Sequence, residues 1–358
     1  MLKLERLREK LVENEVDGLL VTNRYNRQYM TGFTGSTGAA LITADKALFL
    51  TDFRYIEQAT KECIGFEIVD VATTGGKYAF LVNEKAGEFG IKRLAFEERE
   101  MTFADYKEYE EALVGKIEMV STSGLVEGLR LIKTADEIAT LQIAAEIADS
   151  AFHHILGFIK PGLTEVEVAN ELEFFMRKAG ASCSSFGMIV ASGARSALPH
   201  GVASNKVIEK GEMLTLDFGA YYNYYASDMT RTIAVGDPGE KMKEIYAIVK
   251  EAQAYANAQI CPGMTCKEAD ALARDIIDAK GYKEFFGHGL GHGIGLEVHE
   301  LPNVSFKSDD VLVAGMTITN EPGIYIPDLG GVRIEDDLVL TEDGNYSLTI
   351  STKELIIL

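Results

Sequence analysis

The strongest constraint on the fold is an internal repeat in the second two-thirds of the chain. The segment KPGLTEVEVANELEFFMRKAGA at residues 160–181 matches CPGMTCKEADALARDIIDAKGY at residues 261–282 in its Pro-Gly-x-Thr start, its helical pattern and its closing glycine. Both copies carry Thr-x-x-Glu, the capping box that satisfies the first free amides of a helix. A long helical pattern precedes each copy. We therefore expect two α/β halves that pack about a pseudo-twofold axis.

Each copy of the repeat leads into an apolar strand that carries one acidic residue. The strand MLTLDFGA carries Asp217 and the strand MTITNEPGIY carries Glu321, at nearly the same spacing from the preceding Pro-Gly pair. The chain then returns with a second acid in each half, Asp228 in SDMTRTIAV and Glu335 in RIEDDLVL. A lone ionised carboxylate in an apolar strand is costly, and four of them near one axis repel each other. Unless each acid faces solvent on its own strand, the four must take up protons or share cations.

The glycine-rich stretch FGHGLGHGIGLEVHE at residues 286–300 lies between the two acidic hairpins and holds three of the six histidines. Each glycine inside a helix costs about 1 kcal/mol relative to alanine. We therefore expect an extended segment that runs on through the alternating residues 295–299, with a mobile surface loop as the alternative. Glycines in such a segment allow a backbone, a ligand or a metal to approach closely.

Four carboxylates and one imidazole are a ligand set suited to two divalent cations. The oxygen-rich composition favours Mn²⁺, with Co²⁺, Fe²⁺ or Zn²⁺ able to substitute. Two such metals can activate a bridging water and polarise a carbonyl. The residues alone therefore indicate a metal-dependent hydrolase.

The length of the chain, 358 residues, exceeds that of a usual single hydrophobic core, so we expect two domains. An α/β pattern fills the N-terminal third. An amphipathic helix leads into an apolar strand at residues 18–21, and alternating segments at residues 39–51 predict a hairpin. A small polar cluster at residues 121–124 marks the boundary. The expected units are residues 1–123 and residues 124–358.

The composition narrows the class of protein. A net charge of −20 argues against a nucleic-acid or an anionic-membrane partner, since both need a positive surface. The N-terminus lacks the apolar core of a signal peptide, and no run of about 18 apolar residues predicts a membrane span. The four cysteines have no zinc-site spacing and are expected to be reduced thiols. We expect a cytoplasmic protein.

The motifs SALPHG, LDFGAYYNYYASDMTRT, HGLGHGIGLEVHE, NEPGIY and GGVRIED resemble those of the pita-bread metallopeptidases. The resemblance is greatest to the proline-specific branch, the Xaa-Pro aminopeptidases and Xaa-Pro dipeptidases, and it covers essentially the whole chain. It implies an α/β fold with a creatinase-like N-terminal domain and a pita-bread catalytic domain. It also implies a dinuclear-metal exopeptidase that acts on proline-containing peptides and forms at least a homodimer.

The resemblance also assigns the metal site. It implies a dinuclear centre with five protein ligands: Asp217, Asp228, His292, Glu321 and Glu335. Asp228 and Glu335 would bridge both ions. Asp217 would bind one ion only, and His292 with Glu321 would hold the other. The repeat singles out the four carboxylates without help from the family.

Further residues around the ions are implied in the same way. His200, His288 and His299 match family histidines that line the substrate pocket. His299 would stabilise the tetrahedral intermediate, and His200 would lie near the scissile bond. Glu321 would act as a proton shuttle. Arg333 would secure the carboxylate two residues later or contact the substrate.

One position bears on the length of the substrate. A dipeptidase must bind the carboxylate of its substrate, usually with an arginine. Archaeal-type prolidases resemble this chain closely and have an arginine four residues after the histidine that corresponds to His299, whereas this chain has Asn303. The sequence therefore favours an Xaa-Pro aminopeptidase, which releases the N-terminal residue of longer peptides, over the alternative Xaa-Pro dipeptidase (prolidase). Arg333, Arg195 or a lysine from another subunit would reverse this preference by supplying the missing charge.

Two other points stay open at the level of the sequence. A non-catalytic peptide-binding protein of the same fold is a remote alternative, because such a protein should lack at least one ligand and this chain has all five. Asn320 stands where relatives often have an apolar residue before Glu-Pro-Gly. A hydrogen bond to a ligand is one interpretation of this asparagine.

Overall fold

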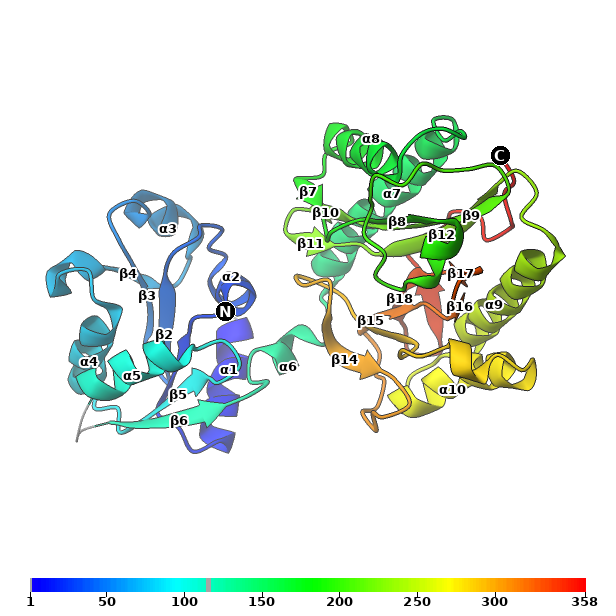
Figure 1. Ribbon diagram of the computed structural model, residues 1–358. Helices are drawn as coiled ribbons and strands as arrows, with labels where there is room; N and C mark the ends of the chain where they lie inside the picture. The colour runs from blue at the N-terminus through cyan, green and yellow to red at the C-terminus, as the bar shows by residue number, and fades with distance from the viewer. Residues whose placement is uncertain (1, 114–116) are drawn as a thin grey trace. The chain divides into compact units, whose positions relative to one another are not determined.

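The computed structural model describes residues 2–113 and 117–358. Its contacts divide the chain into two compact units, Met1–Arg130 and Leu131–Leu358, which Figure 1 shows as the blue-to-cyan and the green-to-red parts of the ribbon. The division falls a few residues beyond the boundary that the polar cluster predicts. Both units mix helices with β-sheet, as the motifs imply.

Helix α6 (Glu127–Arg130) ends the first unit. The Tyr29 hydroxyl donates to the Leu129 carbonyl oxygen at 2.9 Å, and the Arg130 guanidinium donates to the side-chain oxygen of Asn26 at 2.8 Å. These bonds tie the segment after the polar cluster to the first unit, which explains why the division lies beyond that cluster.

The first unit is built on one mixed sheet. Its strands are β1 (Gly18–Val21), β2 (Ala39–Thr43), β3 (Ala47–Thr51), β4 (Glu67–Asp70), β5 (Arg93–Glu97) and β6 (Glu118–Thr122). They run in the order β4-β3-β2-β1-β5-β6, with the expected antiparallel hairpin between β2 and β3. The four inner strands, β3, β2, β1 and β5, are largely buried because their apolar side chains form the core of this unit.

Helices flank this sheet. They are α1 (Leu2–Glu13), α2 (Arg24–Thr31), α3 (Ile56–Glu62), α4 (Tyr78–Glu88) and α5 (Phe103–Ala112), with a 3₁₀ turn at Val71–Thr74. The expected N-terminal helix is α1, which buries Leu7 and Leu11 on one face.

The second unit contains four antiparallel sheets among its described residues. Its strands are β7 (Cys183–Ser184), β8 (Ile189–Ser192), β9 (Glu212–Phe218), β10 (Ala220–Tyr222), β11 (Tyr225–Ala226), β12 (Met229–Val235), β13 (Gly291–Gly293), β14 (Glu300–Val304), β15 (Thr317–Asn320), β16 (Gly323–Ile326), β17 (Gly330–Arg333), β18 (Asp336–Leu340) and β19 (Asn345–Ser347). The two larger sheets have the orders β12-β9-β8 and β14-β13-β15-β18-β19. The smaller ones are β11-β10-β7 and β16-β17.

Two helix pairs cover these strands. They are α7 (Ala135–Leu156) with α8 (Glu165–Lys178), and α9 (Glu240–Gln259) with α10 (Cys266–Ala279), with 3₁₀ turns at Gly193–Ala197 and Lys283–Phe285. In Figure 1, the green pair α7–α8 lies over the strands of the first half, and the yellow pair α9–α10 lies over those of the second. None of the described helices combines the length and the apolar character needed to cross a membrane.

The internal repeat is visible in the start of each second helix. Thr164 caps α8 and Thr265 caps α10, and in both cases the threonine oxygen accepts the backbone amide of the glutamate three residues later while that glutamate accepts the threonine amide. Each threonine also forms an isolated β-bridge, to Val207 and to Val311. The same sequence pattern therefore builds the same local structure twice.

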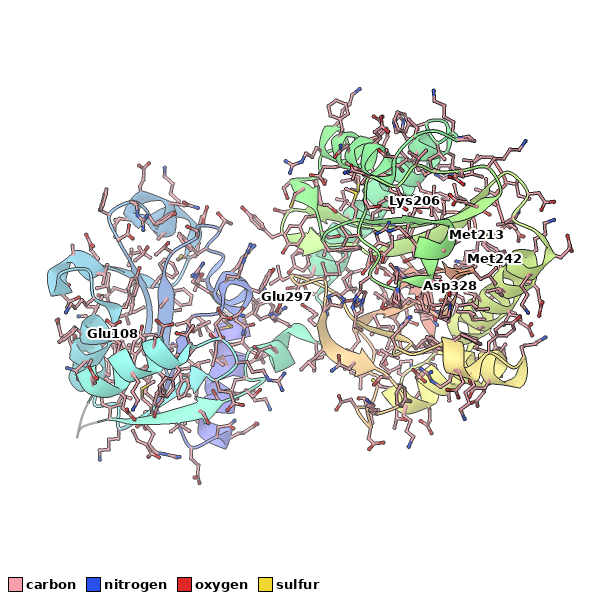
Figure 2. The ribbon with its side chains drawn as sticks, in the orientation of Figure 1. Glu108, Lys206, Met213, Met242, Glu297 and Asp328 are labelled. Atoms are coloured by element: carbon pink, nitrogen blue, oxygen red, sulfur yellow. The ribbon has the colours of Figure 1, made fainter. Side chains whose placement is uncertain are left out.

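Each half has its own hydrophobic core. Helices α7 and α8 pack their buried faces on β8, β9 and β12, while α9 and α10 pack on the strands of the second half. Met213 of β9 joins the second cluster together with Met242 of α9, and both methionines are labelled in Figure 2. All four cysteines are free thiols, two of them buried.

The glycine-rich stretch is only partly extended. Strand β13 covers Gly291–Gly293 and β14 starts at Glu300, but the alternating residues between them form bends, so the expected extended run through residues 295–299 is wrong. The Gly295 amide donates to the Glu297 carbonyl oxygen at 3.0 Å, which closes a tight turn. This turn lets β14 fold back and pair with β13.

Candidate metal centre

One cavity of about 700 Å³ in the second unit brings together all nine residues that the sequence proposes as metal ligands or catalytic residues. They are Asp217, Asp228, Glu321, Glu335, His200, His288, His292, His299 and Arg333. Two of the four carboxylates come from each half of the unit. None of the four faces bulk solvent as an isolated surface acid, because Asp217, Asp228 and Glu335 are buried and Glu321 is half-buried.

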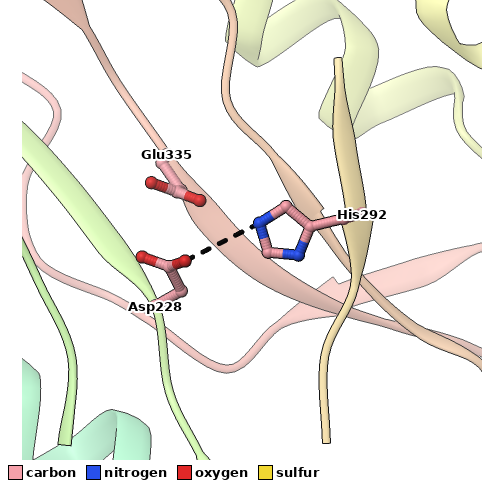
Figure 3. Close-up of side chains that lie close together, drawn as sticks. All are labelled: Asp228, His292 and Glu335. Carbon is pink, nitrogen blue, oxygen red and sulfur yellow. Dashed lines mark ion pairs between the residues drawn. The ribbon is translucent and has the colours of Figure 1, made fainter. Parts of the chain in front are cut away.

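Asp228, His292 and Glu335 form the tightest part of this cluster (Figure 3). One possible ligand atom from each lies within 4.8 Å of the others. Asp228 directly precedes β12, His292 is the middle residue of β13, and Glu335 directly precedes β18. This spacing suits a cation that binds nitrogen and oxygen at about 2.0–2.2 Å.

The other two carboxylates adjoin this group. Glu321 directly follows β15, and its Oε1 lies 3.4 Å from Nε2 of His292. The same nitrogen lies 3.7 Å from Oδ2 of Asp228. Asp217 is in β9, where its backbone pairs with that of Thr230 in β12. Adjacent strands therefore deliver the two acids of the first half to one place.

The local hydrogen bonds of His292 fix which of its nitrogens is free. Nδ1 lies 3.0 Å from the Gly293 carbonyl oxygen, which can only accept, so the proton resides on Nδ1. The lone pair of Nε2 then faces Asp228 and Glu321. Burial lowers the pKa of His292 to about 4, so the ring is neutral at pH 7. A neutral lone pair aimed at carboxylates is the arrangement of a metal ligand.

Three buried carboxylate oxygens in the cluster have no hydrogen-bond donor among the described residues. They are Oδ1 of Asp217, Oδ1 of Asp228 and Oε1 of Glu335. A buried acceptor without a donor is costly, and several such oxygens at one point are costlier still. Divalent cations would satisfy all three, so the donor set fits the metal ions that the sequence predicts.

The electrostatics of the cluster agree with this fit. Burial and then the neighbouring Glu335 and Asp217 raise the pKa of Asp228 well above its ordinary value. Burial, followed by Glu321 and Asp217, does the same for Glu335. Burial raises the pKa of Glu321 to about 8, against the opposing effect of Arg333. Without cations these shifts favour the protonated forms of the three acids, and bound cations would displace the protons.

Arg333 makes a different contact from the one that the sequence suggests. Its Nη2 donates to Asp217 rather than to the nearby Glu335, and its Nε donates to the Thr230 hydroxyl at 3.0 Å. The same hydroxyl donates to Glu335 at 2.6 Å. Arg333 thus holds one carboxylate directly and the other through a threonine, because the strand pairing places Thr230 between them.

Two side chains that contact these residues were not recognised in the sequence. The buried Tyr325 hydroxyl lies 2.9 Å from Nη1 of Arg333 and 2.9 Å from Nε2 of His288, and so connects the two. Thr319 accepts the His292 amide at 3.1 Å and lies 3.3 Å from Glu321 Oε1. Tyr325 closes the NEPGIY motif, which is the one sequence signal that pointed to it.

The glycines of β13 allow the strands to approach closely. A Cβ atom at Gly291 would lie 2.1 Å from the Thr319 carbonyl oxygen, and one at Gly293 would lie 2.0 Å from the Leu301 carbonyl oxygen. Neither position tolerates a side chain without displacement of backbone. The glycines around His292 therefore serve close strand packing at the site.

The two asparagines have different surroundings. Asn303 lines the cavity, and in the β13–β14 ladder it lies opposite His292. Asn320 is fully buried and donates to the Gln253 carbonyl oxygen at 3.0 Å and to Asn257 at 3.2 Å, both on α9. Asn320 therefore contacts a helix, and it is not among the residues that line the cavity.

Comparison with known proteins gives a family for each unit. Residues 139–342 match metallopeptidase family M24, and residues 3–132 match the creatinase/prolidase N-terminal domain. An Xaa-Pro dipeptidase of Pyrococcus furiosus is 43% identical over 99% of both chains. The solved structure of an Xaa-Pro dipeptidase from Bacillus anthracis is 58% identical with a TM-score of 0.97, covering 99% of both chains. That of an X-Pro aminopeptidase from Thermotoga maritima is 40% identical with a TM-score of 0.90, covering 99% of this chain and all of that one.

Proposed function

The chain belongs to metallopeptidase family M24, and on that premise we propose that it hydrolyses the bond between an N-terminal residue and a following proline, with two divalent metal ions, most favourably Mn²⁺. The observation that carries the proposal is the set of buried carboxylate oxygens without donors beside the free Nε2 of His292. A prolyl bond is a tertiary amide without an N–H, so an enzyme that must hydrogen-bond to that N–H cannot cleave it. A site that binds the N-terminal amine and the scissile carbonyl of the substrate does not need this hydrogen bond.

The proposed ligands divide as the resemblance implies. Asp228 and Glu335 would be shared by both ions, Asp217 would hold one, and His292 with Glu321 would hold the other. When bound, the ions supply Lewis acidity that polarises the scissile carbonyl and lowers the pKa of water.

The remaining residues would bind and orient the substrate and move protons. Burial lowers the pKa of His299, so its neutral ring can donate a hydrogen bond to the carbonyl oxygen at which negative charge develops. Its ring centroid lies 4.2 Å from that of His292, which places this donor beside the ligand cluster. Glu321, whose Oε1 lies 3.4 Å from Nε2 of His292, would carry a proton to the leaving proline nitrogen. Arg333 would keep Asp217 in position.

For the length of the substrate we propose Xaa-Pro dipeptides. Support comes from the relatives from Pyrococcus furiosus and Bacillus anthracis, which are named Xaa-Pro dipeptidases and are similar over nearly the whole chain. These relatives favour the dipeptidase alternative over the aminopeptidase that the sequence prefers. An Xaa-Pro aminopeptidase is the second candidate, because the cavity has the neutral Asn303 opposite His292.

The test compares substrates of two lengths on protein loaded with Mn²⁺. Ala-Pro should be cleaved with a kcat/KM at least as high as that of Ala-Pro-Ala, and Ala-Ala should be a poor substrate. A preference of tenfold or more for Ala-Pro-Ala would reverse the choice between the two candidates. Equal cleavage of Ala-Ala and Ala-Pro would contradict proline specificity. Repeating the assay with Co²⁺ and Zn²⁺ at matched occupancy tests the choice of metal.

A homodimer and a cytoplasmic location stay predictions from the sequence. Sedimentation equilibrium at micromolar concentration tests the first, and a single species with the mass of one chain would contradict it. Fractionation of the source cells followed by immunoblotting tests the second.

A further inference from the structure

A dipeptide substrate brings a carboxylate into the cavity, and burying that charge without a cation is costly. Two of the described residues that line the cavity carry a permanent positive charge, Arg333 and Lys307. Among the histidines there, His292 is a proposed metal ligand, and Nε2 of His288 already lies 2.9 Å from the Tyr325 hydroxyl. The question is which cation is free to bind the substrate.

Arg333 is already fully engaged. It is 3% exposed, and besides Asp217 and Thr230 it donates to the Pro199 carbonyl oxygen at 3.2 Å and to the Tyr325 hydroxyl at 2.9 Å. Taking it away from Asp217 would leave a buried carboxylate without its partner, which is strongly unfavourable. Arg333 therefore belongs to the metal cluster and not to the substrate.

Arg195, the other arginine that the sequence suggests, is engaged elsewhere. It forms an ion pair with the fully buried Glu165 and donates to the Val202 carbonyl oxygen at 2.8 Å. It is not among the residues that line the cavity. This leaves Lys307.

Lys307 is exposed, and within the described part of the chain no carboxylate lies within ion-pair distance of its Nζ. Its ammonium lies 5.2 Å from the centre of the Phe306 ring, which is also 4.7 Å from the Arg274 guanidinium. A cation held beside an aromatic ring keeps its charge available for a second partner.

The backbone around Lys307 is fixed rather than loose. Ser308 donates its amide to the Ser305 carbonyl oxygen at 3.0 Å, which closes a turn directly after β14. The Ser308 carbonyl oxygen accepts the amide of Lys267 at 2.9 Å, and this ties the turn to the start of α10. The lysine thus emerges from an anchored turn at the cavity wall.

Lys307 lines the same cavity as the proposed metal ligands. Asn303 lies opposite the proposed ligand His292, and Lys307 follows in the turn at the end of the same strand. The carboxylate of a dipeptide lies about two residues, or roughly 7 Å, from the amine. A flexible lysine supplies a point charge and three donors without the strict geometry of an arginine.

We infer that Lys307 binds the C-terminal carboxylate of the substrate, in place of the arginine for which this chain has Asn303. The inference rests on the proposed function, since it assumes that Xaa-Pro dipeptides enter the cavity. A charge-assisted hydrogen bond from Lys307 would be stronger than the neutral one that Asn303 offers. This explains how a chain without that arginine can still accept dipeptides.

The experiment compares three substrates: Ala-Pro, Ala-Pro-amide and Ala-Pro-Ala. In Ala-Pro-amide a neutral amide group replaces the negatively charged carboxylate of Ala-Pro. Lys307→Ala should raise the KM of Ala-Pro about tenfold, which is a typical effect of one charge-assisted hydrogen bond. The kcat for Ala-Pro, and the KM of the amide, should change less than about twofold. Lys307→Arg should keep the wild-type KM for Ala-Pro. Lys267→Ala is the matched control, because it removes one exposed lysine next to the same turn but outside the cavity.

The outcomes separate the two proposals. If the wild type cleaves Ala-Pro and Lys307→Ala cleaves it with the same KM, the proposed role of Lys307 is overturned. The proposed function would still stand. Equal losses on Ala-Pro and Ala-Pro-amide would overturn the role of Lys307 too, since they would show a structural effect. Failure of the metal-loaded wild type on all three peptides would overturn the proposed function itself.

Discussion

The first half of the second unit, from α7 to β12, and the second half, from α9 to β18, repeat one scaffold but provide different side chains. Both start their second helix with the same threonine–glutamate cap and both bring two acids to the cavity. The first half supplies the short acids Asp217 and Asp228. The second supplies the longer Glu321 and Glu335, and it also supplies His292.

The supporting contacts cross between the halves. Arg333 of the second half holds Asp217 of the first, and Thr230 of the first half holds Glu335 of the second. The repeat therefore sets where the backbone runs, whereas the chemistry depends on the differences between the copies. Asp217 and Glu335 are each held by a side chain from the other half.

The largest expected effect concerns one acid from each half. Asp228→Asn and Glu335→Gln keep the shape of the side chains but remove the charge that both proposed ions share. Each substitution should lower kcat/KM by more than roughly 100-fold. That is the loss expected when a residue that only hydrogen-bonds to a metal ligand is removed. Metal analysis should show less than two ions per chain, with an unchanged far-ultraviolet circular dichroism spectrum.

The control for these variants is Glu342→Gln, which removes an exposed charge outside the cavity. It should keep full activity and metal content. If only one of the two site variants loses metal, the proposal that each half contributes a ligand shared by both ions would be wrong.

The next effect compares the arginines of the two halves. Arg333→Lys loses the donors that reach both Asp217 and Thr230, so activity should fall about 10- to 100-fold, as for other partners of metal ligands. Arg195→Lys, in the first half, should leave kcat/KM within about threefold because Arg195 does not line the cavity. Steady-state assays on both variants test this prediction. Similar losses of kcat/KM in the two variants would show that the two arginines do not differ in their importance for activity.

The acids should make metal-free protein sensitive to pH. The pKa of Glu321 is raised from 4.5 to about 8 on folding, so between these values the folded protein holds a proton that the unfolded chain releases. Stability is therefore lost as pH rises, by roughly 1–2 kcal/mol between pH 6.5 and 8. Burial lowers the pKa values of His288 and His292 to about 4, so these two residues make the folded protein more stable as pH rises. They do so only below pH 6.5, the ordinary pKa of histidine, and therefore outside the range of pH 6.5 to 8.

Denaturant unfolding of chelator-treated protein at pH 6.5 and pH 8 measures this effect. Saturating Mn²⁺ should stabilise the protein at both values, and more strongly at pH 8, where fewer protons compete. A metal-free protein that is more stable at pH 8 than at pH 6.5 would contradict the raised pKa values.

The smallest effect tests the symmetry itself. Thr164→Ala and Thr265→Ala each remove a helix cap and should each lower the free energy of unfolding by about 1 kcal/mol. Because the two caps have the same partners, the two losses should agree within about 0.5 kcal/mol. Urea unfolding of metal-loaded protein measures both, and a loss confined to one cap would mean that the copies are energetically unequal.

The main features of the fold were predictable from local patterns. The repeat, its two caps and the strands of residues 18–21 and 39–51 follow from periodicity and capping chemistry, which act over a few residues. The convergence of four acids followed from the duplication, because equal spacing in two copies places equivalent strands at one axis. The prediction of an extended segment at residues 295–299 was wrong. The alternation of apolar and polar residues there is typical of a strand, but the Gly295 amide closes a turn instead.

The sequence by itself determined the two-fold scaffold, the proposed ligands and the family. Only the tertiary structure decided the partner of Arg333, the helix contact of Asn320 and the place of Lys307 in the wall of the cavity. Spacing along a chain tells which face of a strand a side chain occupies, but not which distant side chain lies opposite. That choice depends on how strands roughly a hundred residues apart pair and pack, and it decides that Arg333 contacts Asp217.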